Sequence, residues 1–179
     1  MARNIVGLTS IHVGEPLPKG AKDSGAAALV AGWKKITQPY QGGVQTNFTL
    51  PTSTEFFREN EADPFYSASD GSTATKKLTW EVADWDDNTL NFYFGTTEIE
   101  EGKLYEGEKG FAFDAKGGVT MVFARLKYVA IPTGGMNATE PLRISVEATI
   151  LGPENGGAGW YPMATPKYTG GDYVVGEDE

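Results

Sequence analysis

The single histidine is the first residue to test for chemistry. The chain has 179 residues, one histidine, His12, and no cysteine, so a nucleophilic site would have to combine His12 with a serine and a carboxylate. His12 stands between Ile11 and Val13 in a strand-like run, where a lone histidine is more often structural than catalytic. The common glycine-rich nucleotide motifs and the serine motif of hydrolases do not occur. We therefore expect no enzyme, no catalytic residue and no cofactor.

The acidic run 84–88 is the next candidate, because its spacing resembles the start of a calcium-binding loop. Such a loop needs a glycine where Thr89 stands and a bidentate acid where Gly95 stands. The same residues suit a helix: Asp84 can cap it, an aspartate follows three residues later, and Gly95 stands where a C-terminal cap belongs. The run predicts a helix over about 85–94 and no metal site.

Five glutamates between positions 98 and 108 raise the question of a glycosidase, which places two carboxylates across a sugar. Glycines and lysines are interspersed with them, so we interpret the stretch as a solvated loop. The glutamates are Glu98, Glu100, Glu101, Glu106 and Glu108.

Four aromatic residues stand in a long polar connection, 51–73. Loops of this length in a compact domain are usually functional or bind a partner. The aromatic side chains could stack on sugars, pack beneath the loop as a small second core, or bury against a neighbouring subunit. The residues leave these alternatives open, and we take the four as candidate subunit or ring contacts. They are Phe56, Phe57, Phe65 and Tyr66.

The composition excludes several partner classes. The formal net charge is -9, which disfavours a general grip on nucleic acid, because such binding relies on Lys and Arg releasing phosphate counterions. The N-terminus lacks the apolar core of a signal peptide and no run of about 18 apolar residues occurs, so we expect no membrane anchor. Twenty-three glycines and ten prolines, spread along the chain, are typical of many turns between short strands.

Strand-like alternation determines the predicted architecture. The clearest period of two covers 74–82, 121–130 and 142–150, with a first strand at 4–13 and a similar segment at 44–50. These segments predict a mainly β protein, an antiparallel β-sandwich or half-barrel with one short flanking helix. We expect a single β domain over 1–151. Residues 152–179, rich in Gly, Pro and Tyr, are expected to form a loosely packed extension with an acidic tip.

The order of these elements resembles the tail tube, or major tail, proteins of long-tailed bacteriophages. The strand, short helix and glycine of 78–95 carry most of the resemblance, and the long closing strands at 119–131 and 142–151 add to it. The layout is similar over about 4–151, whereas 152–179 is longer than a minimal member of the family needs.

The resemblance implies a structural virion protein. Six copies would close into a ring, and stacked rings would form a hollow tube through which genomic DNA passes without sequence-specific binding. It implies a tape measure protein, a tail terminator and tail tip proteins as partners, assembly in the host cytoplasm and a final place in the virion tail. A closed head-to-tail ring also uses strand edges that would otherwise aggregate.

Other classes stay open at this point. A head decoration or connector protein, or the tube of a contractile injection device, would share the β-rich acidic composition. A carbohydrate-binding β-sandwich would use the aromatic residues of 51–73 for stacking on sugars.

Overall fold

The computed structural model describes eight stretches of the chain, which contain ten strands and two helices. The described residues are 6–18, 26–40, 43–49, 52–56, 66–70, 76–100, 102–136 and 139–176. The strands are β1 (Val6–Gly14), β2 (Lys34–Ile36), β3 (Gln45–Phe48), β4 (Thr52–Phe56), β5 (Tyr66–Asp70), β6 (Lys76–Val82), β7 (Tyr105–Lys116), β8 (Val119–Thr133), β9 (Arg143–Ile150) and β10 (Trp160–Ala164), and the helices are α1 (Ala26–Ala31) and α2 (Asp87–Phe94).

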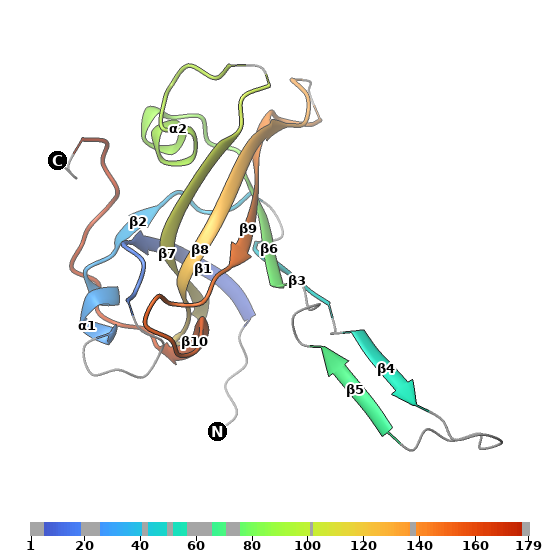
Figure 1. The fold of residues 1–179 in the computed structure, drawn as a ribbon. Coiled ribbons are helices and arrows are strands. Elements are labelled where there is room, and N and C mark those ends of the chain that lie inside the picture. The colour runs from blue at the N-terminus through green and yellow to red at the C-terminus, as the bar shows by residue number, and fades with distance from the viewer. Residues whose placement is uncertain are drawn as a thin grey trace.

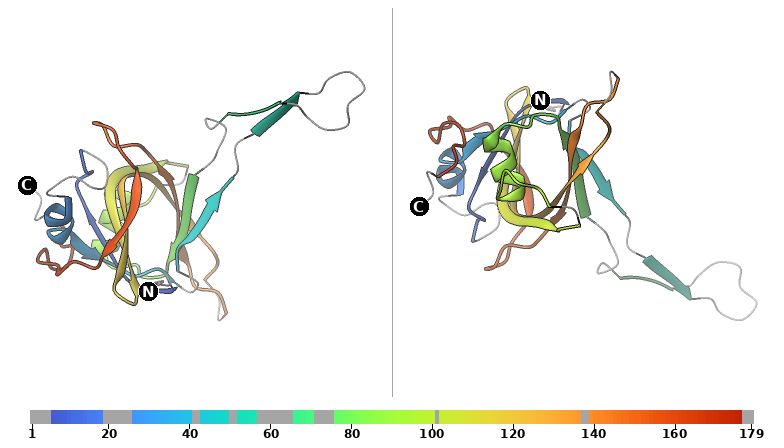
Figure 2. Two further views of the ribbon diagram at one scale, coloured as in Figure 1. Left: turned by 90° about the horizontal axis from the view of Figure 1, so that it is seen from below. Right: turned by 90° about the horizontal axis from the view of Figure 1, so that it is seen from above.

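Eight of the strands form one antiparallel sheet (Figure 1). Its order is β2-β1-β7-β8-β9-β6-β3, with β10 paired to β8 beside this path. The sheet curves around a central core, as the end-on views of Figure 2 show. The prediction of a mainly antiparallel β protein is confirmed. The strands form one curved open sheet, the half-barrel form of that prediction, instead of two sheets packed face to face.

The core lies on both faces of the middle strands. The larger cluster fills the concave face and includes Trp80 of β6, Phe92 of α2 and Phe111 of β7. A smaller cluster lies on the other face, where α1 and Trp33 pack against β7 and β8. Residues 110–115 of β7 are therefore buried without interruption, because a strand covered on both faces has no solvent side.

The N-cap of helix α2 lies two residues later in the chain than the sequence analysis predicted. Its N-cap is Asp86, whose carboxylate accepts the backbone N–H of Thr89 at 2.9 Å, and not Asp84, which is exposed. The reason is that Asp86 holds the extended backbone that a cap requires, with φ -76° and ψ 160°. Gly95 closes the helix in the left-handed region at φ 68°, as predicted.

The two aspartates provide a matched test of this cap. Asp86→Ala is expected to lower the free energy of unfolding by about 1 kcal/mol, because Thr89 loses its acceptor. Asp84→Ala should change stability by no more than about 0.5 kcal/mol, as is usual for exposed positions. Urea unfolding of both variants measures the difference. An equal loss in the two variants would contradict the assignment of the cap.

The acidic stretch after α2 is a strand in part, which corrects the prediction of a loop. Glu106 and Glu108 lie within β7 and pair with Lys127 and Arg125 of the neighbouring β8. The prediction took the glycines of this stretch as signs of a loop. Gly107 instead lies within β7, where a Cβ would lie 2.4 Å from the hydroxyl oxygen of Tyr128. The glycine therefore admits an aromatic ring instead of marking a turn.

Residues after 151 also differ from expectation. Strand β10 pairs with the first residues of β8, and Tyr161 is buried in the smaller core cluster. The segment 165–175, here called the C-terminal strap, then runs back across the molecule to β2. The described part of the predicted extension is therefore packed on the domain, because its tyrosines supply apolar area that covers the sheet.

Candidate assembly interface

A curved open sheet leaves strand edges, and their state decides how the molecule can associate. The edge at β2 is covered by the C-terminal strap. Lys35 donates its N–H to the carbonyl oxygen of Gly171 and accepts from the N–H of Tyr173, both at 2.8 Å. The strap thus satisfies the outer backbone groups at the centre of this short strand.

The outer side of β10 is weakened by proline. Pro162 stands at its centre, opposite Met121 of β8. Because proline has no N–H to donate, a strand that contains it is a poor template for further pairing. Two of the three edges in the described sheet are therefore protected.

The edge at β3 has no such protection. Strand β3 ends the order of the sheet and, within the described residues, pairs only with β6. All four of its residues are exposed, none is charged and none is proline. The side chain of Phe48 is 44% exposed and lies at a cavity of about 550 Å³, where its ring is 5.9 Å from that of Trp160. Such an edge favours pairing with another chain.

Strands β4 and β5 form a projecting hairpin, here called the arm (residues 52–70). Figure 1 shows them extending away from the curved sheet, and they pair only with each other among the described strands. The register of β3 on β6 sets Phe48 opposite Lys76, so the arm is an insertion between two neighbouring strands. The predicted polar loop is therefore, in its described part, a β-hairpin.

Two of the four aromatic candidates lie at the end of the described arm, away from the residues that connect it to the curved sheet. Phe56 ends β4 and Tyr66 begins β5, and the two are directly paired in the register. Phe57 and Phe65 lie outside the described residues. In the sequence, Phe57 directly follows Phe56 and Phe65 directly precedes Tyr66.

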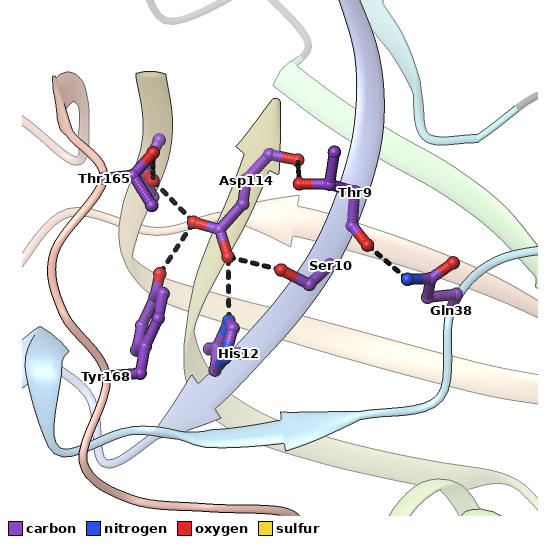
Figure 3. Close-up of polar contacts among 8 residues, drawn as sticks. Thr9, Ser10, His12, Gln38, Asp114, Thr165 and Tyr168 are labelled. Atoms are coloured by element: carbon purple, nitrogen blue, oxygen red, sulfur yellow. Dashed lines mark hydrogen bonds and ion pairs between the residues drawn. The ribbon is translucent and has the colours of Figure 1, made fainter. Parts of the chain in front are cut away.

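A buried polar cluster holds the strap on the sheet (Figure 3). Its centre is Asp114 of β7, which is 2% exposed. The Nδ1 atom of His12 lies 2.9 Å from the Oδ2 atom of Asp114, and Ser10 donates to the same oxygen at 2.7 Å. Thr120 and Tyr168 donate to Oδ1, the latter at 2.7 Å. The ring of Tyr168 also stacks on that of His12, with centroids 3.4 Å apart.

Ionisation of this cluster is set by burial and hydrogen bonds. Burial by itself raises the pKa of Asp114, but the contacts from His12, Thr120, Ser10 and Tyr168 outweigh it and lower the pKa below its ordinary value. Burial and the neighbouring carboxylate raise the pKa of Tyr168, so its phenol stays protonated and remains a donor. Asp114 is therefore a charged hub between β1, β8 and the strap.

The geometry does not reproduce a serine–histidine relay. In such a relay the serine hydroxyl bonds to the imidazole, and the carboxylate holds the other ring nitrogen. Here Ser10 and His12 both face the same oxygen of Asp114. The arrangement can fasten three segments together, and it directs no hydroxyl at a base.

One of the acidic residues considered as metal ligands, Asp86, caps helix α2. Asp86 uses both carboxylate oxygens on Thr89. Across the described residues, no group of three or more His, Cys, Asp or Glu side chains is placed to hold a metal ion. None of the helices in those residues is long and apolar enough to cross a membrane.

Sequence reasoning missed three features of the strand edges and of the buried polar cluster. The strap and the β2 edge it covers gave no local signal, because Lys35 and Gly171 are far apart in the chain. Pro162 was a usable signal, since proline in a strand indicates an edge. Asp114 was a second usable signal, because a carboxylate inside the apolar run 111–115 must either be buried with hydrogen-bond partners or end the strand.

No protein-family model and no curated protein matches the chain.

Proposed function

We propose that this chain is the repeating subunit of a self-assembled protein tube of the phage tail-tube kind. The observation that carries the proposal is the open β3 edge, which continues directly into the arm. A chain that protects two edges and leaves the third exposed and uncharged is suited to pairing at that third edge. The layout that resembles tail tube proteins supports the same proposal.

The charge of the chain fits a conduit for DNA. With a formal net charge of -9, the subunit as a whole repels phosphate. A wall of this kind gives the genome little to bind and lets it slide. In the proposed assembly, six copies form a ring and the rings stack, in the tail of a virion.

Imaging of the purified full-length chain tests the proposal. Negative-stain electron microscopy, together with light scattering, is expected to show tubes or rings with six-fold symmetry. Assembly should increase with protein concentration, as for any self-association. A chain that stays monomeric or trimeric at the highest soluble concentration contradicts the proposal.

A further inference from the structure

A groove of about 510 Å³ lies beside α1, here called the α1 groove. Figure 2 shows α1 and the arm on opposite sides of the curved sheet in both views. The lining is largely apolar and includes Leu29, whose side chain is 54% exposed. The other residues used below are Leu17, Trp33, Lys34, Lys109 and Tyr173.

The charge of the arm is opposite to that of the α1 groove. Residues 52–70 carry five carboxylates and one arginine, a formal net charge of -4. The groove is lined by two lysines and by one carboxylate, Glu15, which accepts from Lys109 at 2.8 Å. The larger cavity at Phe48 has no charged residue in its lining. Complementary charge therefore favours the α1 groove over that cavity as a partner for the arm.

The apolar parts also match. Residues 56–66 of the arm include four aromatic residues by sequence, and burying an aromatic side chain is favourable because it removes a large apolar area from water. In the groove, Leu17 and Trp33 form an apolar floor and Leu29 an exposed rim. Aromatic side chains that enter an apolar groove ringed by polar groups are the usual anchors of protein interfaces.

We infer that the α1 groove is the acceptor site for the arm of a second copy of this chain. This inference rests on the proposed function and specifies its contact. The lysines of the groove receive the carboxylates of the arm, and the apolar floor receives the aromatic residues of 56–66.

The opposite placement of arm and groove gives the contact a direction. Each copy offers its arm on one side and its groove on the other, so the interface is heterologous. Heterologous contacts join copies head to tail and produce rings or filaments. A reciprocal dimer would leave no free arm to continue the assembly.

Cross-linking between two single-cysteine chains tests the contact, and the absence of native cysteine makes the reaction selective. One chain carries Leu29→Cys in the groove. The other carries Ala62→Cys in the arm and a small tag that separates the products by size. The chains are mixed under assembly conditions and treated with a short bismaleimide. The mixed covalent dimer is then measured on a denaturing gel.

The matched control replaces Leu29→Cys by Met136→Cys. Met136 is 89% exposed and lies between β8 and β9. The Leu29→Cys mixture should give about tenfold more mixed dimer than the control, because docking raises the local concentration of the two thiols. Equal yields from the two mixtures in an assembling protein would overturn the inference and leave the proposed function standing. If imaging shows that neither mixture assembles, the proposed function fails first and the inference fails with it.

Discussion

A chain in which residues 49–75 are replaced by Asn-Gly is expected to fold normally and to remain monomeric. The register sets Phe48 opposite Lys76, so a two-residue turn can join β3 to β6 directly, and Asn-Gly suits that turn. The arm pairs only with itself among the described strands. Its removal should therefore change the free energy of unfolding by less than about 1 kcal/mol, in part because a shorter loop costs less entropy to close.

Assembly is where the effect of this deletion should be large. Without the arm, rings and tubes should be absent by negative-stain microscopy, and light scattering should report the mass of one chain. The matched control is Leu104→Ser, which removes an apolar side chain that is 63% exposed but lies outside the arm and β3. That variant should assemble like the wild type. Tubes formed by the armless chain would exclude the arm as the main contact.

Asp114→Ala is expected to be the most destabilising of the substitutions considered, with a loss of about 3 kcal/mol or more. The change leaves Ser10, Thr120 and Tyr168 without their common acceptor in a buried site and removes the carboxylate that lies 2.9 Å from Nδ1 of His12. Removing one partner from a buried charged network costs this much because the remaining polar groups stay desolvated. Chemical denaturation at neutral pH measures the loss. An unchanged midpoint would show that the hub contributes little to stability.

The hub also predicts how wild-type stability depends on pH. The pKa of Asp114 is lower in the folded chain than its ordinary value. Its stabilising contribution is therefore complete above the unfolded pKa of about 4 and is lost as the pH falls through the folded pKa. Asp114→Asn should reduce the acid dependence of the unfolding free energy relative to the wild type. Identical slopes below pH 4 would contradict this role for Asp114.

Trypsin cleavage of the strap shows whether weakening the contacts of Asp114 opens the strap locally or unfolds the whole chain. Tyr168 contacts Asp114 and His12 from the strap, while Lys167 beside it is exposed. Weakening the hub should therefore speed trypsin cleavage after Lys167 more than cleavage within the sheet. This order follows because local opening requires less free energy than global unfolding.

Strand content and the short helix were accessible from sequence because both depend on local periodicity. Alternation in 74–82 and 142–150 matched strands whose alternate residues are buried, as in Leu78, Trp80 and Val82. The helix ended at Gly95 as predicted, since a left-handed cap is a property of that residue. Its start was misplaced by two residues, because three aspartates compete for the cap and only backbone geometry selects Asp86.

The amino-acid sequence alone was enough to predict a mainly antiparallel β chain, and it shows a formal net charge of -9 and an aromatic, acidic stretch at 52–70. Each of these depends on composition or on neighbours along the chain. The folded chain was needed to show that the described parts of this stretch form an arm, that β3 is the open edge among the described strands, and that the strap covers β2. Those features depend on contacts between distant residues, such as Lys35 with Gly171, and no local pattern encodes which distant partner completes an edge.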